Sequence, residues 1–257
     1  MNPHLKKYLN FTIDTAYQAG RLTLRYFQNG VQADFKADDT PVTIADKQAE
    51  ELIRTRIERH FPQHAIIGEE FGKIRTENAT HRWFIDPIDG TKSFVRGVPL
   101  YAVLIGLEIE GKIEVGVVYF PALDEMIYAA SGSGCYWNGR QTHVMSTGSL
   151  NRSVICFTDP ADFARYHRRE AWERLKQASY YRAGWTDAYG HALVATGRVE
   201  LMLDPIMSPW DCGPFPVILR EAGGFFGDWA GNETIYGNEA LSTSQKLLPE
   251  VLNVIKG

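Results

Sequence analysis

The chain is poor in the residues that build disulfide or zinc frameworks. Its 257 residues include three cysteines, Cys135, Cys156 and Cys212, and none of them has the spacing of a CxxC pair or a zinc finger. A disulfide-stapled secreted domain and a structural zinc site are therefore not indicated. We expect the three thiols to be small buried groups in a reducing compartment.

Signals for membranes and nucleic acids are also missing. No apolar run is long enough to span a bilayer, and residues 1–14 lack the apolar centre of a signal peptide. A formal charge of -4 gives no sign of a surface that binds nucleic acid or anionic lipid. We find no internal repeat and no low-complexity segment. The expected protein is cytoplasmic, without nucleic-acid or membrane partners.

What is present is an ordinary globular composition. With 44% hydrophobic and 23% charged residues, a chain of 257 residues can bury a large core. We predict a single domain over residues 1–257, with an N-terminal half at about 1–145 and a C-terminal half at about 146–257.

Apolar periodicity predicts the order of the elements. In the first half we expect a helix from Leu5 to Phe27, a polar loop, a helix from Asp46 to about His60, and strands at 65–67, 83–85, 101–108, 113–120 and 126–130. In the second half we expect strands at 154–157, 199–203 and 240–242, and helices at 162–177, 191–196, 210–222 and from 246 onward. The helix at 191–196 contains His191, which we interpret as structural.

The stretch 83–93 carries the most chemistry. An apolar run ends at Asp86-Pro87, and Asp89 follows directly before Gly90 and Thr91. Proline cannot donate to a sheet ladder, so we expect the strand to end there. Ligand sites of α/β sheets lie at that end of strands, and carboxylate oxygens are the ligands that Mg²⁺ takes. A plain turn is the competing interpretation, because Asp-Pro and Asp-Gly are common turn dipeptides.

Further acids stand at the ends of other predicted elements. With the two above, the set is Glu69, Asp86, Asp89, Asp204 and Asp211. If neighbouring strands pair, these acids converge, and a cluster of unpaired acids is costly unless cations bind it. Paired metals are a common device for hydrolysing phosphate esters. A hydroxyl such as Thr91, held by Asp46, could then position and deprotonate the attacking water.

Three other features have simpler interpretations. Glu69 and Glu70 could form only a solvated strand edge. The loop 131–134 (Ser-Gly-Ser-Gly) lacks the lysine and the following helix of a phosphate-binding P-loop, so we expect a tight connection between strands. The arginines between 165 and 174 are expected to form a solvated helix face.

Three of these motifs together resemble the signatures of the inositol monophosphatase family. They are Gly68-Glu69-Glu70, then Trp83 to Thr91, then Trp210-Asp211, in an order and spacing that agree along nearly the whole chain. The resemblance implies an α/β fold, a layered αβαβα sandwich of the sugar-phosphatase type. It also implies a Mg²⁺-dependent, lithium-sensitive phosphatase that is usually a homodimer.

The resemblance also assigns roles position by position. It implies two or three Mg²⁺ per site, with Mn²⁺ as a possible substitute. The implied metal ligands are Glu69, Glu70, Asp86, the Ile88 carbonyl, Asp89 and Asp211, and Glu69 also counts among the catalytic groups. Thr91 and Asp46 match the pair that activates the attacking water. Asp89, Gly90, Thr91 and Asp211 would contact the substrate, with the Gly90 and Thr91 amides on its phosphate.

Two stretches look most like the histidinol-phosphatase branch of this family: 92–99 and 187–197. The resemblance implies that the inositol branch has a small apolar residue beside the polyol ring at the position that matches Asp187. At the position that matches Asp204, it implies a ring-binding glutamate. Two carboxylates beside the leaving group suit a cationic substrate such as L-histidinol phosphate, an intermediate of histidine biosynthesis. In the competing interpretation, Asp187 only caps the helix that follows. Phe94 and Trp185 are further candidates for the pocket wall.

Other functions stay open at this point. The chain could be a phosphatase of inositol phosphates, sugar bisphosphates or 3′-phosphoadenosine compounds, although an acid at 187 speaks against it. It could also be a non-catalytic protein that binds metal or phosphate. Such a protein would be expected to lose Thr91, Asp46 or a metal carboxylate, and all of them are present.

Overall fold

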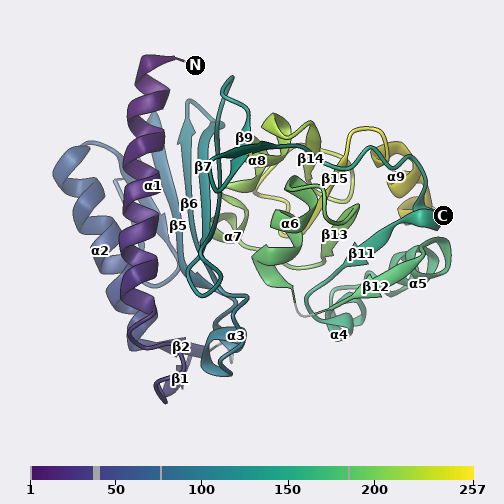
Figure 1. The fold of residues 1–257 in the computed structure, drawn as a ribbon, viewed down its shortest axis with the longest axis horizontal. Helices are drawn as coiled ribbons and strands as arrows, with labels where there is room; N and C mark the ends of the chain where they lie inside the picture. The colour runs from purple at the N-terminus through teal and green to yellow at the C-terminus, as the bar shows by residue number, and fades with distance from the viewer. Residues whose placement is uncertain (1, 37–40, 76, 185) are drawn as a thin grey trace.

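The computed structural model describes residues 2–36, 41–75, 77–184 and 186–257. The elements stack in five layers (Figure 1). Helices α1 and α2 cover one face of a large sheet, α6, α7 and α8 lie between it and a smaller sheet, and α4, α5 and α9 cover the far side. The layered α/β fold predicted from the sequence is confirmed.

The helices and strands have the following bounds. The helices are α1 (Pro3–Thr23), α2 (Ile44–His60), α3 (Thr91–Val95), α4 (Pro160–Arg165), α5 (Arg169–Ala178), α6 (Asp187–Ala195), α7 (Pro209–Cys212), α8 (Phe215–Glu221) and α9 (Leu248–Lys256). The strands are β1 (Ala33–Phe35), β2 (Pro41–Thr43), β3 (Ala65–Gly68), β4 (Gly72–Ile74), β5 (His81–Asp89), β6 (Ala102–Ile109), β7 (Lys112–Phe120), β8 (Glu125–Ala130), β9 (Cys135–Trp137), β10 (Arg140–Thr142), β11 (Val154–Cys156), β12 (Tyr181–Ala183), β13 (Leu201–Asp204), β14 (Gly224–Gly227) and β15 (Ala240–Ser244).

The large sheet has the strand order β10-β9-β8-β7-β6-β5-β3-β4. All of its neighbours pair antiparallel except β3 and β5, which run parallel, so their carboxyl ends meet at one edge. The small sheet has the order β12-β11-β13-β15-β14, and β13 runs parallel to β11.

Both faces of the large sheet are buried. Trp83 and Ile85 pack toward α1 and α2, whereas Phe84 packs toward the inner helices. A strand covered on both faces reads as a continuous apolar run, which is why 83–85 showed no alternation. The three cysteines are buried and unbridged, as expected. Within the described residues, no helix is long and apolar enough to cross a membrane.

Strand β5 does not end at Asp86-Pro87, and that prediction was wrong. The strand continues to Asp89, and its pairing with β6 shifts register between Asp86 and Asp89. Pro87 sits in this irregular stretch, where the strand needs no ladder donor. The bulge carries Asp86 and Asp89 together to the edge of the sheet.

Three predicted helices are shorter than the apolar periodicity suggested. The first ends at Thr23, and residues 24–30 form tighter turns in place of the expected extension to Phe27. The helix predicted at 162–177 is two helices, separated where His167 has a positive φ of 60°. The helix predicted at 210–222 is also two helices, because Pro214 interrupts α7 and α8.

Two connections between strands follow from local backbone geometry. The hairpin of β6 and β7 turns at Glu110 and Gly111, whose φ values of 52° and 83° fit a turn with two left-handed residues. The polar loop predicted after the first helix contains a short hairpin instead, in which β1 pairs with β2. Its tip, 37–40, lies outside the described residues.

The β6–β7 pair also fixes the position of α7. Gly106 and Gly116 pair across the two strands, and a Cβ at either would lie 2.3 or 2.2 Å from a backbone oxygen of the Gly213-Pro214 connection. Only glycine at both positions lets this connection rest directly on the sheet. Asp211 on α7 is thereby held over the end of β5.

The stability of the aromatic cluster under α1, which contains His64 and Trp83, should depend on pH. The Trp83 indole donates to His64 Nδ1 at 3.0 Å, so His64 must be unprotonated there. Burial, with the neighbouring His81, lowers the pKa of His64 to about 4. Since an unfolded histidine protonates near pH 6.5, stability is complete above that pH and falls as the pH drops toward 4.

We expect His64→Asn, which keeps an acceptor near Nδ1 but cannot titrate, to remove this part of the pH dependence. Between pH 7 and pH 5 the wild-type protein should lose about 1 kcal/mol more free energy of unfolding than the variant, after allowance for the partial exposure of the ring. Urea unfolding at the two pH values measures the difference. The exposed His60→Asn serves as control, and equal losses in wild type and His64→Asn would contradict the assignment.

Candidate metal and phosphate site

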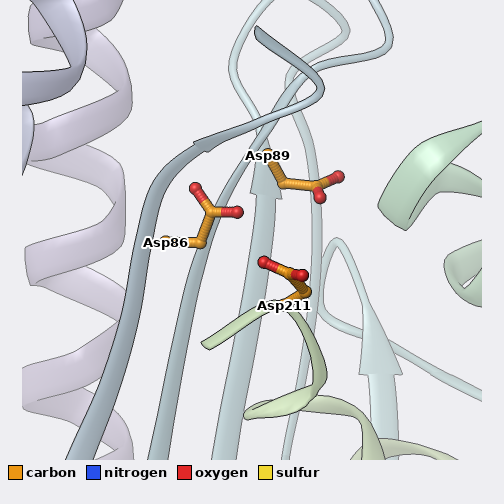
Figure 2. Close-up of side chains that lie close together, drawn as sticks. All are labelled: Asp86, Asp89 and Asp211. Atoms are coloured by element: carbon orange, nitrogen blue, oxygen red, sulfur yellow. The ribbon is translucent and has the colours of Figure 1, made fainter. Parts of the chain in front are cut away.

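Three aspartates meet where β5 ends (Figure 2). Asp86 and Asp89 come from β5 and Asp211 from α7, and one carboxylate oxygen from each lies within 4.8 Å of the others. In the described ranges, no other three His, Cys, Asp or Glu side chains bring their ligand atoms this close together. The structure therefore brings together, from two elements over 120 positions apart in the chain, acids that the sequence only placed at element ends.

Burial and mutual repulsion raise the pKa values of these acids. Burial, with Glu69, Asp89 and Asp211 nearby, raises the pKa of Asp86 well above its usual range. Burial also raises the pKa of Asp211 to about 7, against a lowering by the Ser208 amide. Carboxylate oxygens of Asp86 and Asp211 lie within 4.8 Å of each other. Carboxylates so close need a proton or a cation between them.

All of the predicted metal ligands except Glu70 line one cavity. Its volume is about 160 Å³, and its wall includes Glu69, Asp86, Ile88, Asp89 and Asp211, together with Gly90, Thr91 and Asp187. The donors that face this cavity are carboxylates and a backbone carbonyl. An all-oxygen set of this kind suits a hard divalent cation, so the residues present fit Mg²⁺ or Mn²⁺.

Glu70 lies at the margin of this group. The Lys36 ammonium contacts Oε1 of both Glu69 and Glu70 at 2.7 Å. Burial raises the pKa of Glu70 to about 7, although the Lys36 contact lowers it. Lys36 thus places a positive charge against two of the predicted metal ligands.

Glu50 on α2 orders the loop that carries these two glutamates, and the sequence analysis missed it. Its carboxylate accepts the amides of Glu70 and Phe71 at 2.7 and 3.2 Å and pairs with Arg54. The sequence did contain an indication of this role. Asp46, Glu50 and Arg54 recur every four residues, on the face of α2 that also carries the apolar Ile53 and Ile57. Charged residues within a buried stripe indicate a structural or functional network.

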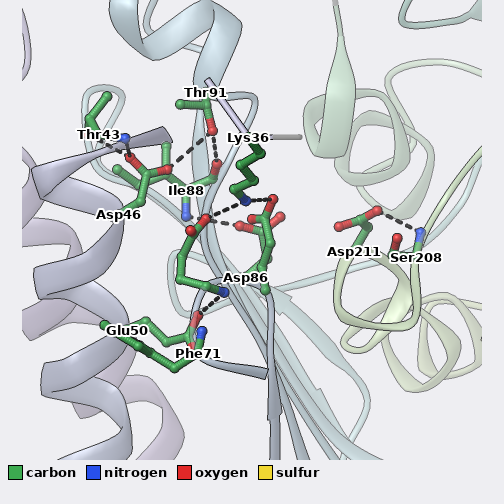
Figure 3. A network of polar contacts seen from close by, with 12 residues as sticks. Lys36, Thr43, Asp46, Glu50, Phe71, Asp86, Ile88, Thr91, Ser208 and Asp211 are labelled. Carbon is green, nitrogen blue, oxygen red and sulfur yellow. Dashed lines mark hydrogen bonds and ion pairs between the residues drawn. The ribbon is translucent and has the colours of Figure 1, made fainter. Parts of the chain in front are cut away.

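The pair Thr91 and Asp46 is assembled as predicted (Figure 3). The Thr91 hydroxyl lies 3.2 Å from Asp46 Oδ1 and 3.0 Å from the Ile88 carbonyl oxygen. Thr43 donates its amide and its hydroxyl to Asp46 Oδ2, at 2.8 and 2.6 Å. Burial raises the pKa of Asp46, whereas the Thr43 contacts lower it. One oxygen of Asp46 is thus anchored and the other faces Thr91.

Two site acids are third residues of their helices. Asp46 closes a capping box with Thr43 at the start of α2. Asp211 accepts the Ser208 amide at 2.7 Å at the start of α7 (Figure 3). The pattern Thr/Ser-x-x-Asp was readable in the sequence and would have located both carboxylates at helix N-termini, where their orientation is fixed.

Asp187 does not act as a helix cap. Its carboxylate accepts the Ser93 hydroxyl at 3.3 Å, and the first free amide of α6, that of Ala188, donates to Asp89 at 2.7 Å instead. Asp187 has a φ of 41°, a strained value for a residue with a side chain. Burial, with Asp204 adding to it, raises the pKa of Asp187 to about 6. The cap interpretation is therefore wrong.

Gly90 explains the close approach of these segments. Its φ is 79°, and a Cβ at this position would lie 3.1 Å from Asp187 Oδ2. Glycine therefore lets the backbone at the start of α3 run directly beside the Asp187 carboxylate.

A second cavity adjoins the first and is acidic. Its volume is about 140 Å³, and five aspartates contribute to its wall: Asp89, Asp162, Asp187, Asp204 and Asp211. Asp204 stands at the end of β13 and is buried. Asp162 was not among the predicted site residues, because it was predicted only as the first residue of the helix at 162–177. A larger cavity of about 680 Å³ shares Lys92 and Asp187 with the first.

The remaining expectations have mixed outcomes. The loop 131–134 does connect two strands, and its Gly132 and Gly134 amides bind the Glu221 carboxylate at 2.9 and 2.7 Å. The prediction that the arginines between 165 and 174 form a solvated helix face was wrong in part. Arg168 pairs with Glu239, and Arg174 donates to carbonyls in the last turn of α9. Phe94 is buried among other aromatic rings and is not among the residues that line the two acidic cavities. Trp185 lies outside the described residues.

Comparisons with known proteins agree with this geometry. The sequence model of the "Inositol monophosphatase family" matches residues 4–255. A "Histidinol-phosphatase" of Chlorobaculum parvum is 43% identical over 93% of each chain, and an "Inositol-1-monophosphatase" of Mesorhizobium japonicum is 32% identical over 95% of this chain and 94% of its own. The solved structure of "extragenic suppressor protein suhB" from Bartonella henselae superposes with a TM-score of 0.90 at 28% identity, covering 97% of this chain and 98% of the other.

Asp89→Asn should separate charge repulsion from folding. The variant removes one of the clustered charges and keeps an acceptor for the Ala188 amide. In EDTA we expect it to be more stable than wild type by roughly 1 kcal/mol. Saturating Mg²⁺ should stabilise wild type by about 2.7 kcal/mol at one hundred times the dissociation constant, and the variant far less.

Thermal unfolding across a Mg²⁺ series measures both effects. Asp14→Asn, on an exposed position of α1, is the matched control and should respond to Mg²⁺ as wild type does. An Mg²⁺ response of Asp89→Asn equal to that of the control would remove Asp89 from the ligand set.

Proposed function

Because this chain belongs to the inositol monophosphatase family, we propose that it is a Mg²⁺-dependent phosphomonoesterase that hydrolyses L-histidinol phosphate to L-histidinol and phosphate. The observation that carries the proposal is an acidic cavity fused to an all-oxygen metal cavity through Asp89, Asp187 and Asp211. The first cavity suits the phosphate and its cations, and the second suits a positively charged leaving group.

The metal ligands in this proposal are Glu69, Asp86, Asp89, Asp211 and the Ile88 carbonyl, with Glu70 for a further, weaker cation. Bound divalent cations would supply positive charge for the phosphoryl oxygens and lower the pKa of water. The chain supplies the rigid frame, since the bulge in β5 and the start of α7 fix the carboxylates before any ligand arrives.

The nucleophile in this proposal is a water held by Thr91. The Thr91 hydroxyl can donate its hydrogen bond to Asp46 Oδ1, 3.2 Å away, which leaves its oxygen to accept a hydrogen bond from water. As the water attacks, its proton would pass to Thr91 while the Thr91 proton passes to Asp46. Asp46 is suited to this task because its other oxygen is held by Thr43, so only Oδ1 is available. The Gly90 and Thr91 amides at the start of α3 would contact the phosphate.

The leaving group lies toward Asp187 and Asp204 in this proposal. Histidinol carries an ammonium group and an imidazole, and both can donate to carboxylates. Asp187 faces the junction of both cavities, where a group next to the ester oxygen would sit. A neutral polyol would leave these acids without a cation, which costs binding free energy.

The relatives leave one alternative in the same class, a phosphatase of inositol or related sugar and nucleotide phosphates. The Mesorhizobium japonicum protein bears such a name at 32% identity.

The homodimer implied by the resemblance and a cytoplasmic location remain predictions. Sedimentation equilibrium of the purified chain measures the first.

A substrate panel tests the proposal. With Mg²⁺ we expect phosphate release from histidinol phosphate to exceed that from inositol monophosphate, fructose bisphosphate and 3′-phosphoadenosine phosphate by at least about 100-fold in kcat/KM. Preference for one of the other three would keep the metal site and reject the substrate. No release from any of them by metal-loaded protein would reject the phosphatase assignment in favour of a binding role.

Asp187→Asn tests the charge of the pocket, since asparagine keeps an acceptor for Ser93. We expect KM for histidinol phosphate to rise roughly 30-fold, or about 2 kcal/mol, because a charged pair is lost. KM for glycerol phosphate, whose leaving group is neutral, should change little. Asp159→Asn on the rim of the larger cavity is the control. Equal effects of Asp187→Asn on both substrates would mean that Asp187 recognises no cation.

A further inference from the structure

His191 lies behind the acidic cavity, in a position that a purely structural histidine does not need. It sits on α6, is completely buried, and packs its ring against Phe215 and Phe226 at 4.9 and 5.4 Å between centroids. Its Nδ1 lies 2.6 Å from the Ser242 hydroxyl, and its Nε2 lies 3.4 Å from Asp204 Oδ2. The imidazole thus connects the core of the small sheet to a wall of the cavity.

The Asp204 carboxylate decides which ring nitrogen carries the proton, because the Ser242 hydroxyl can either donate to Nδ1 or accept from it. If Nδ1 donated to Ser242, the lone pair of Nε2 would face the Asp204 carboxylate in a buried space, which is repulsive. If the Ser242 hydroxyl donates to Nδ1, the Nε2–H points at Asp204 and both contacts are attractive. The second arrangement is therefore the stable one beside an ionised carboxylate.

The Nε2–H has no better partner in the described part of the chain. At 3.4 Å the contact with Asp204 is too long to be a full hydrogen bond, and Nε2 is one of two buried side-chain nitrogen or oxygen atoms without a hydrogen-bond partner there. A buried donor without a partner is costly and usually marks a contact completed by movement or ligand. Hydrogen bonds in functional sites often tighten only when the ligand binds.

Asp204 in turn depends on His191. Among the described residues, no other side chain forms a hydrogen bond or ion pair with the Asp204 carboxylate, although four more aspartates surround the same cavity. Without the imidazole, this carboxylate would face only like charge and could rotate away from the ligand. With Oδ2 directed at Nε2, Oδ1 remains for the cavity.

We infer that His191 is a positioning residue for substrate specificity, whose Nε2–H orients Asp204 so that its other oxygen accepts a hydrogen bond from the cationic part of the leaving group. This inference rests on the proposed function, because it assumes a cationic phosphomonoester. It extends that function by assigning the rotamer of Asp204 to a residue outside the cavity wall.

Two amide substitutions at His191 test the role. In His191→Gln the side-chain amide can occupy the place of Nε2–H, whereas in His191→Asn it reaches only the place of Nδ1. We expect His191→Asn to raise KM for histidinol phosphate about 10-fold with kcat nearly unchanged, and His191→Gln to restore most of that loss. Asp204→Asn combined with His191→Asn should be no worse than Asp204→Asn alone. The exposed His143→Asn is the control.

Equal KM values for the two amide variants would overturn the inference, and so would additive losses in the double variant. An equal rise of KM for glycerol phosphate would also overturn it, because a general disturbance of the fold affects both substrates.

A spectroscopic measurement on the wild-type protein covers the case in which the variants fold poorly. In protein with ¹⁵N-labelled histidine, we expect His191 to show the Nε2–H tautomer with a proton protected from exchange. The Nδ1–H tautomer would overturn the inference and leave the substrate panel untouched. Failure of histidinol phosphate in that panel would reject the proposed function even with the Nε2–H tautomer present, so the two failures are distinguishable.

Discussion

Repulsion among buried carboxylates is the constraint on which the rest of this structure depends. Asp86, Asp89 and Asp211 present oxygens within 4.8 Å of one another, and burial raises the pKa of each. Such a cluster destabilises the metal-free fold, so the surrounding structure must hold the acids in place against their own charge. A bound cation would remove the repulsion, and the charge that destabilises the fold would then contribute to the affinity for metal.

The scaffold meets this constraint with local backbone devices rather than with many ion pairs. The bulge around Pro87 aims two of the acids, and the start of α7 orients the third through the Ser208 amide. The Ala188 amide at the start of α6 steadies Asp89. Helix N-termini carry partial positive charge, so the contacts with the Ser208 and Ala188 amides offset part of the repulsion. They leave other carboxylate oxygens available for a ligand. The strained φ of Asp187 belongs to the same arrangement.

Much of this could be predicted from the sequence, because the information was local. The acids at element ends followed from residue types and spacing, and the pairing of Thr91 with Asp46 was supported by the motif resemblance. The continuation of β5 through Pro87 could not be predicted, since the bulge depends on how β6 pairs with it. The breaks near His167 and Pro214 were hidden by continuous apolar periodicity. Asp162 and His191 gained their positions only from tertiary packing, which brings α4, α6 and β13 to one cavity.

The arrangement of these carboxylates suits divalent cations above all. Anomalous X-ray scattering from crystals grown with Mn²⁺ and phosphate tests that claim most directly. We expect manganese peaks bounded by Glu69, Asp86, Asp89 and Asp211, with phosphate oxygen toward Gly90 and Thr91. Crystals without a manganese peak among these residues, at metal concentrations that saturate the protein in solution, would contradict it.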